Sequence, residues 1–123
     1  MIKSETRTHK IKLIDDIIWA ETKTEFVEPF KKIHAEELYA KVKSMTKGEQ
    51  YFLILIAKNG KIEAEARNFI KKNLQQVNKF AIVTTNHMTN FMGNLFLGLH
   101  KLEVPIKLFS NENDALEWIK RRD

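Results

Sequence analysis

Seven consecutive apolar residues, YFLILIA, run from Tyr51 to Ala57 without a polar interruption. Gly48 precedes this run and Asn59-Gly60 follows it, and both are typical of turns. A short strand that is apolar on both faces needs cover from both sides, as a central strand has when helices lie on each face of its sheet. The run therefore favours an α/β fold.

The N-terminal residues predict an antiparallel β-hairpin. Ile11 and Leu13 alternate with lysines at the end of residues 6–13, which is typical of a half-buried strand. Asp15-Asp16 suits a turn, and the alternation resumes in residues 17–23. We expect this hairpin to occupy residues 1–24.

Helical and strand patterns alternate through the rest of the chain. Apolar residues at three-four spacing predict a helix that begins between Phe30 and His34 and ends at Met45, before Gly48. The downstream predictions are helices over residues 62–74, over residues 88–102 and after a cap at Ser110 or Asn111, with strands over residues 80–83 and 106–109. We expect a single domain over residues 1–123, in which residues 30–123 form a helix followed by a βαβαβα core.

Residues 80–109 form the most apolar of these units, a predicted strand, helix and strand. Most apolar side chains of the predicted helix share one stripe, which favours a structural role in the core. Leu97 projects nearly opposite that stripe. With Phe96, it is a candidate contact surface for a partner or a second copy.

Charge and composition limit the function classes. The 123 residues carry a formal net charge of +5 and contain no cysteine, which excludes disulfides and thiolate metal sites. Lysine supplies most of the positive charge and is interleaved with acidic residues, which favours solvated helix faces over a nucleic-acid interface. No apolar run is long enough to span a bilayer and no signal peptide is evident, so we expect a cytoplasmic protein without a transmembrane segment.

No motif for catalysis or metal binding is recognisable. His9, His34, His87 and His100 show no i, i+4 pairing and no carboxylate at metal-ligand spacing. The glycines form no phosphate-binding loop and no dinucleotide fingerprint, and no nucleophile elbow is present. We therefore expect no enzymatic activity, no cofactor and no metal.

The candidate binding residues follow the predicted parallel strands. Ligands of such sheets usually bind beyond the carboxyl ends of the strands, where helix N-termini offer unpaired amides. Ser110 and Asn111 follow the last strand at the same edge of the sheet, and they are also predicted helix caps. The ligand or partner candidates are Lys58, Asn59, Gly60, Thr84, Thr85, Asn86 and His87, together with Phe96 and Leu97. The alternative is that the polar residues among them only cap helices and make turns.

Four runs resemble one known family: EARNFI at residues 65–70, AIVTT at 81–85, NFMGNLFLGLHKLEVPIKLF at 90–109 and LFSNENDALEWIK at 108–120. They are similar to the SpoIIAA-like, or STAS-like, bacterial domains found as small stand-alone proteins in Bacteroidetes. The resemblance covers nearly the whole chain. It implies a βα superhelix with an about five-stranded mixed sheet, an N-terminal β-hairpin and four helices.

The resemblance also bears on regulation. Better-known relatives are anti-sigma-factor antagonists, which bind a kinase-type partner and are switched by phosphorylation of a Ser or Thr after the central strand. Here that loop, residues 57–61, contains no hydroxyl side chain. The phosphate switch is therefore not expected at that position.

Three hypotheses on function remain open. The first is a non-enzymatic regulatory or protein-interaction module that acts through a protein partner or self-association. The second is a carrier of a small hydrophobic or lipid-like ligand, held between the predicted 88–102 helix and the sheet. The third and weakest is nucleic-acid binding through the scattered lysines.

Overall fold

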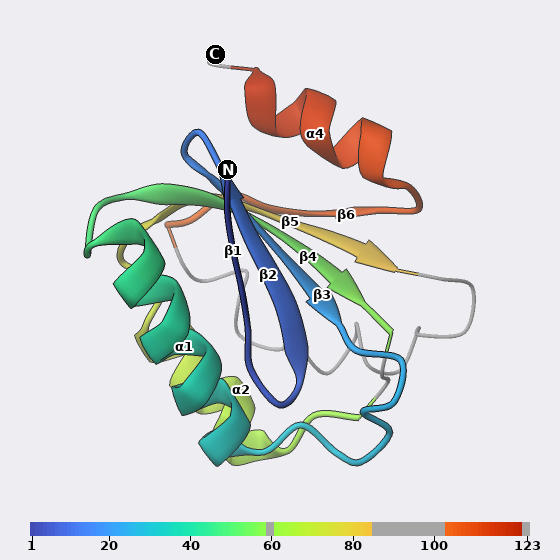
Figure 1. Ribbon diagram of the computed structural model, residues 1–123. Helices are drawn as coiled ribbons and strands as arrows, with labels where there is room; N and C mark the ends of the chain where they lie inside the picture. Colours follow the sequence, from blue (N-terminus) through green and yellow to red (C-terminus); the bar gives the residue numbers. More distant parts are fainter. Residues whose placement is uncertain (59–60, 85–102, 122–123) are drawn as a thin grey trace.

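The computed structural model describes residues 1–58, 61–84 and 103–121. Its centre is a six-stranded sheet. A pair of helices covers one face of this sheet and a single helix covers the other (Figure 1). The strands are β1 (Ile2–Glu5), β2 (His9–Ile14), β3 (Ile17–Thr22), β4 (Tyr51–Ala57), β5 (Val77–Thr84) and β6 (Ile106–Phe109). The helices of the described residues are α1 (Lys32–Thr46), α2 (Ala64–Lys72) and α4 (Glu112–Lys120).

The strands follow one another across the sheet in sequence order. β1, β2 and β3 pair antiparallel, whereas β3 to β6 pair parallel. The turn between β2 and β3 is Asp15-Asp16, as predicted, with Asp15 in the left-handed region at φ 56°. β4 lies inside the sheet between β3 and β5, so the prediction of a central strand is confirmed.

The helices divide between the two faces of the sheet. α1 connects β3 to β4 and α2 connects β4 to β5, and the two helices pack together on one face (Figure 1). Right-handed crossovers between strands in sequence order place their helices on the same face, which explains this arrangement. α4 follows β6 and packs on the opposite face against β4, β5 and β6.

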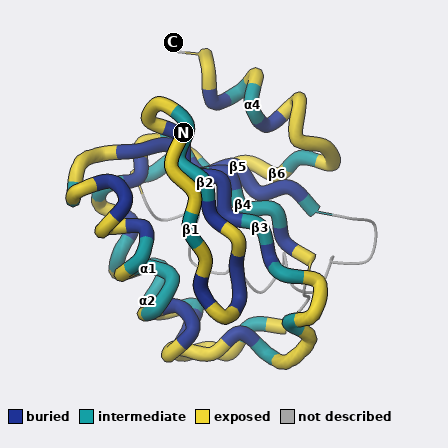
Figure 2. Tube along the Cα trace, in the orientation of Figure 1, coloured by how far each residue is buried: buried dark blue, intermediate teal, exposed yellow. Residues whose placement is uncertain are grey.

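Alternation along the strands separates the core into two layers. Ile18 pairs with Leu53 and Leu53 with Phe80, and these side chains pack toward α1 and α2. The neighbouring row, Trp19, Ile54 and Ala81, packs toward α4. Buried residues concentrate along these strands, while the outer sides of the helices are exposed (Figure 2). The period of two thus gives β4 two buried faces.

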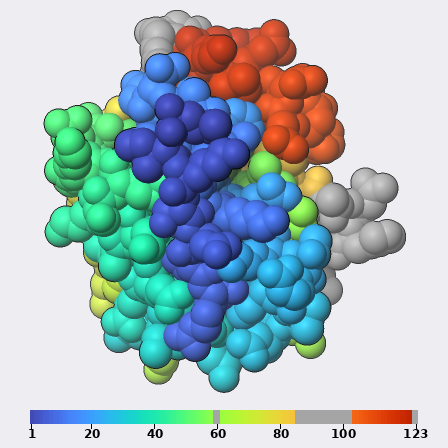
Figure 3. All heavy atoms as spheres, in the orientation of Figure 1, coloured from blue at the N-terminus to red at the C-terminus, as the bar shows by residue number. Residues whose placement is uncertain are grey.

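The sheet has one strand more than the sequence predicted. β1 pairs with β2 through Ile2 and Leu13 at one end and Glu5 and Lys10 at the other. Ile2 is 52% exposed and the other β1 residues are polar, so this edge strand is held mainly by backbone hydrogen bonds and leaves little apolar pattern. Consequently β2 begins at His9 and the expected hairpin is a three-stranded antiparallel unit. Its residues form a continuous band across one face of the molecule (Figure 3).

Several helix boundaries also differ from the prediction. α2 is shorter than residues 62–74, because Ile62 lies in a β-bridge with Phe30 and Asn73 ends the helix. α1 ends at Thr46, one residue beyond the predicted Met45, and its C-cap Lys47 is left-handed at φ 55°, immediately before Gly48. α4 begins after Asn111, as expected. The predicted 88–102 helix, the fourth of the expected four, lies outside the described residues.

No helix among residues 1–58, 61–84 and 103–121 has the length and hydropathy needed to cross a bilayer.

Candidate functional site

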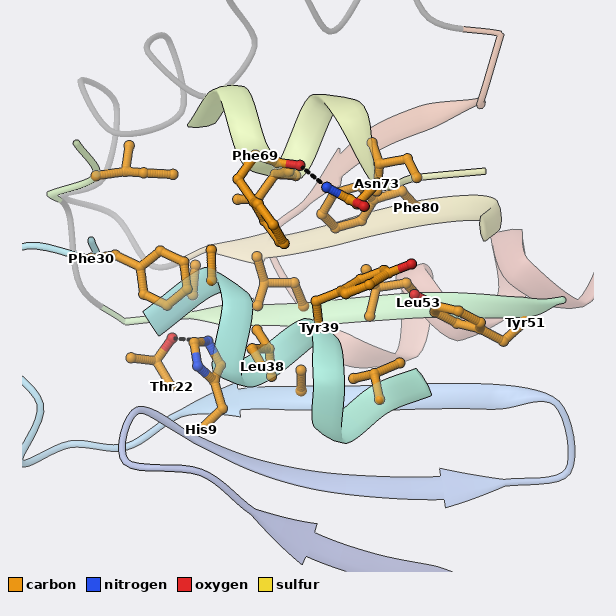
Figure 4. A pocket seen from close by; sticks show the side chains of 18 of the residues that line it. His9, Thr22, Phe30, Leu38, Tyr39, Tyr51, Leu53, Phe69, Asn73 and Phe80 are labelled. Carbon is orange, nitrogen blue, oxygen red and sulfur yellow. Dashed lines mark hydrogen bonds between the residues drawn. The ribbon is translucent and has the colours of Figure 1, made fainter. Parts of the chain in front are cut away.

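A cavity of about 110 Å³ lies between the sheet and the pair of helices α1 and α2 (Figure 4). The strands contribute His9, Ala20, Thr22, Tyr51, Leu53, Leu55, Ala57 and Phe80 to its lining. The helices and the segments beside them contribute Phe26, Phe30, Ala35, Leu38, Tyr39, Val42, Ile62, Phe69, Ile70, Asn73 and Leu74. Apolar cavities of roughly 150 Å³ bind a single benzene ring, so this cavity is in the size range of one ring.

The described lining contains no aspartate, glutamate, lysine or arginine. This is notable in a chain whose residues are 30% charged. An ion placed among these side chains would lose its hydration without gaining an oppositely charged partner, which is costly. The cavity therefore favours uncharged contents.

One end of the cavity carries a chain of polar contacts centred on His9. Thr6 Oγ1 accepts hydrogen bonds from the backbone N–H groups of Thr8 and His9, at 3.2 and 3.1 Å. Thr8 Oγ1 lies 3.3 Å from Thr6 Oγ1 and 2.7 Å from His9 Nδ1. On the other side of the ring, Thr22 Oγ1 lies 3.4 Å from His9 Nε2 and donates to the carbonyl oxygen of Ile56 at 3.2 Å (Figure 4).

The hydrogen-bond network around the ring favours one tautomer of His9. The Thr6 oxygen already accepts two N–H groups, so its hydrogen points to Thr8, and the Thr8 hydroxyl donates to His9 Nδ1. The ring proton is then on Nε2, which donates to the Thr22 oxygen. At 3.4 Å this contact is longer than the usual N–H···O range of about 2.7–3.2 Å. His9 thus holds a weakly used N–H donor at the cavity.

His9 is uncharged at neutral pH. Burial, with a further contribution from the nearby His34, lowers the pKa of His9 from 6.5 to about 4. Only 4% of the residue is exposed. A base with so low a pKa takes up protons poorly near pH 7, so the imidazole is suited to hydrogen bonding rather than to general-base chemistry.

Aromatic rings surround the imidazole. Phe30 meets His9 edge to face at 5.6 Å between ring centroids, and Phe26 meets His34 in the same way at 5.0 Å. His34 Nδ1 accepts the backbone N–H of Lys31 at 3.0 Å, which fixes its ring at the start of α1. These four rings therefore pack together, and His9, Phe26 and Phe30 among them form the end wall of the cavity.

The opposite end of the cavity carries two phenols and an amide. Tyr39, Tyr51 and Asn73 lie there, away from His9 (Figure 4). Burial, with a smaller contribution from Tyr39, raises the pKa of Tyr51 to about 12. Asn73 Nδ2 donates to the carbonyl oxygen of Phe69 at 2.8 Å. This end is also uncharged.

Two segments that are distant in sequence close the end near His9. The backbone N–H of Phe30 donates to the Lys61 carbonyl, and the N–H of Glu63 donates to the Phe30 carbonyl, at 2.9 and 3.0 Å. This bridge joins the segment after β3 to the segment after β4. It holds Phe30 and Ile62 in the cavity lining.

The described part of the chain includes two of the sequence-predicted candidates. Lys58 follows β4 and its Nζ pairs with the Glu21 carboxylate. Thr84 is half-buried at the end of β5, opposite Ala57 of β4, so the carboxyl ends of these strands do lie side by side. Neither residue lines the cavity. The other candidates, Asn59, Gly60, Thr85, Asn86, His87, Phe96 and Leu97, lie outside the described residues.

The sequence reasoning missed the cavity and its polar end. His9 has the same parity as Ile11 and Leu13, and Thr22 has the same parity as Ile18 and Ala20. Extending the alternation by one step would have placed both polar side chains on the buried face of the sheet. Their pairing, by contrast, depends on the register of β2 on β3.

No group of three histidine, aspartate or glutamate side chains able to hold a metal occurs within the portion of the chain that the structure describes. The described cavity lining also lacks a carboxylate that could orient His9 as a base. The site can accommodate an apolar molecule and offer hydrogen bonds to it.

The mixed sheet with its N-terminal antiparallel unit defines a SpoIIAA-like fold. A crystal structure of an uncharacterized protein from the DUF3478 family, with a SpoIIAA-like fold, from Shewanella loihica PV-4, is similar with a TM-score of 0.62. The similarity covers 94% of this chain and 98% of that chain at 14% sequence identity. The fold implied by the sequence resemblance is confirmed.

The family described as Domain of unknown function (DUF7793) matches residues 11–122, and the chain belongs to this family. No curated protein matches the sequence.

Proposed function

We propose that this protein is a non-enzymatic binding module that holds a small, uncharged, largely apolar molecule in the cavity between α1, α2 and the sheet. The observation that carries the proposal is the cavity itself, whose described lining is almost entirely apolar and has no charged residue. Small-molecule sites typically combine such a lining with a few placed polar groups. His9 and Thr22 at one end and Tyr39, Tyr51 and Asn73 at the other fit that description.

The carrier pocket expected from the sequence involved residues 88–102, which lie outside the described residues. The described lining of the cavity comes from β2, β3, β4, β5, α1, α2 and the segments beside them. A bound molecule would contact both helices and the sheet at once. Because it would bind the folded state only, it would stabilise that state by mass action, and a regulatory role would follow from this linkage.

The proposal can be tested by filling the cavity. Leu38 of α1 lines it, so Leu38→Trp should occupy the space that a ligand needs. Ala40, also in α1, is exposed, and Ala40→Trp is the matched control. Toluene should raise the melting temperature of the wild-type protein and of Ala40→Trp, and should leave that of Leu38→Trp unchanged. Equal responses of all three proteins, or no response of the wild type, would contradict the proposal.

Protein interaction is the second candidate function. Val27 is 79% exposed and Ile33 is 56% exposed. Both belong to the part of the chain that also supplies Phe26 and Phe30 to the cavity. Large apolar side chains near a ligand site are suited to contact a partner. If they do, Val27→Glu should weaken self-association in sedimentation experiments or capture of a partner, while the melting temperature stays within about 2 °C of the wild type.

A further inference from the structure

The polar groups of the cavity are not equally available to a bound molecule. The Thr22 hydroxyl donates to the Ile56 carbonyl at 3.2 Å, and Asn73 Nδ2 donates to the Phe69 carbonyl at 2.8 Å. His9 Nδ1 lies 2.7 Å from Thr8 Oγ1 and, in the favoured tautomer, accepts a hydrogen bond from it. His9 Nε2–H is different, because its acceptor, the Thr22 oxygen, is 3.4 Å away. Among these groups it is the donor with most to gain from a better acceptor.

We infer that the cavity selects a small uncharged ring compound that carries a hydrogen-bond acceptor, such as a carbonyl oxygen, and that His9 Nε2–H donates to this acceptor. This inference rests on the proposed function and adds the chemical class of the ligand. The apolar ring would lie against Leu38, Leu55 and the helix side of the cavity. Its acceptor would face the end wall formed by His9 and Phe30.

Selection against anions follows from the same residues. A carboxylate beside His9 would be stabilised if the imidazole were protonated, but burial and the neighbouring His34 oppose protonation. No lysine or arginine is present in the described lining to replace that charge. An isolated carboxylate would then be buried without a counter-ion, which is strongly unfavourable.

The preference for a ring compound with a hydrogen-bond acceptor over a purely apolar one should be smaller than the preference for uncharged compounds over anions, but measurable. A neutral hydrogen bond contributes a net free energy that corresponds to a roughly three- to tenfold change in affinity. The imidazole is held on its other side by Thr8, so its Nε2–H direction is set before binding. Such preorganisation reduces the entropic cost of forming the new bond.

Three probes of nearly identical shape test the inference. Acetophenone carries a carbonyl oxygen, α-methylstyrene replaces that oxygen by a methylene group, and benzoate carries a charge. Dissociation constants are measured by NMR titration of the ¹⁵N-labelled protein at pH 7. We expect acetophenone to bind about three- to tenfold more tightly than α-methylstyrene and at least about tenfold more tightly than benzoate.

Each outcome of these titrations is decisive. Equal binding of acetophenone and α-methylstyrene would overturn the role of His9 while leaving the proposed function in place. Benzoate binding as tight as that of acetophenone would overturn the selection for uncharged ligands. If none of the three binds, the inference fails together with the proposed function.

Two variants locate the donor. His9→Phe keeps an aromatic ring beside Phe30 but has no N–H, so the preference for acetophenone over α-methylstyrene should fall to about one. Thr22→Val keeps the shape of the side chain and removes the competing oxygen, so the preference should be retained or increased. A loss of preference in Thr22→Val would overturn the inference, because it would identify the Thr22 hydroxyl as the donor.

A measurement on the wild type does not depend on the folding of any variant. Imidazole ¹⁵N spectra report which ring nitrogen carries the proton. We expect His9 to be the Nε2–H tautomer, and we expect its Nε2–H signal to shift on addition of acetophenone and to shift less with α-methylstyrene. An Nδ1–H tautomer, or equal shifts, would overturn the inference.

Discussion

His9 and Thr22 are directly opposite each other in the antiparallel pairing of β2 and β3, and His9 Nε2 lies 3.4 Å from Thr22 Oγ1. The strand register therefore brings a buried imidazole and a buried hydroxyl together at one end of the cavity. Both residues are at least 95% buried. The imidazole gains hydrogen bonds there, but the part of the cavity lining that the structure describes holds no carboxylate beside it. Burial and the nearby His34 lower the pKa of His9, so the folded state favours the neutral imidazole.

The free energy of unfolding should decrease as the pH falls from about 6.5 to about 4. In the unfolded chain His9 takes up a proton near its ordinary pKa of 6.5, whereas in the folded chain its pKa is about 4. The unfolded state therefore binds more protons in this window. The stability is fully present above pH 6.5, and a loss of roughly 3 kcal/mol is expected by pH 4. Urea unfolding at a series of pH values measures it.

The variant His9→Gln isolates this contribution, because glutamine does not titrate. The slope of stability against pH between 6.5 and 4 should be smaller in the variant than in the wild type. Two other titratable groups lie near the imidazole: His34, and Glu28, whose carboxylate oxygen lies 3.7 Å from His34 Nε2. The wild type and His9→Gln share these two groups, so their titration is common to both curves. Parallel curves for the two proteins would be inconsistent with a depressed His9 pKa.

The free energy of unfolding should also decrease at alkaline pH, because of Tyr51. Burial raises the pKa of its phenol from 10 to about 12, so the unfolded chain loses this proton at lower pH than the folded chain does. The contribution is fully present below pH 10 and is lost as the pH rises toward 12, with a total of roughly 3 kcal/mol.

The chain has two tyrosines, so the difference in phenolate absorbance between the wild type and Tyr51→Phe reports the titration of Tyr51. A midpoint near 10 in the folded protein would refute this prediction.

Much of the fold could be predicted from the alternation of side chains along the strands. It places Ile18 and Trp19 on opposite faces of β3, and the structure has them in the two separate core layers. The apolar run of β4 likewise predicted a strand with helices on both sides. β1 was missed, because an exposed edge strand is held by backbone hydrogen bonds and needs no apolar pattern.

The candidate site was predictable only in part. The inward direction of His9 follows from alternation, because it shares a face with Ile11. Its contact with Thr22 requires the register of two strands, and its proximity to Phe30 and His34 requires the path of the chain after β3. Such long-range geometry leaves no local pattern in the sequence.

The attachment of α4 to the sheet should depend strongly on Ile119. This side chain is fully buried in the core layer that includes Ile54 and Ala81. Ile119→Ala should lower the free energy of unfolding by about 2–5 kcal/mol, whereas Ile119→Val should lower it by only about 0.5–1.5 kcal/mol. The cavity lies on the other face of the sheet, so toluene should bind the folded variants as it binds the wild type. A small effect of Ile119→Ala would mean that α4 is loosely attached.

The start of α4 depends on a single side-chain cap. Asn111 Oδ1 accepts the backbone N–H of Asp114 at 2.9 Å, which satisfies one of the unpaired amides at the helix N-terminus. Asn111→Ala should lower the free energy of unfolding by about 1 kcal/mol, whereas Asn111→Ser, which restores a capping oxygen, should recover most of that loss. Urea unfolding of the three proteins measures both values. If serine and alanine were equally destabilising, the cap would not contribute through its hydrogen bond to the backbone. The effect would then have to come from the hydrogen bond that Asn111 Nδ2 donates to the Asp114 carboxylate at 3.0 Å.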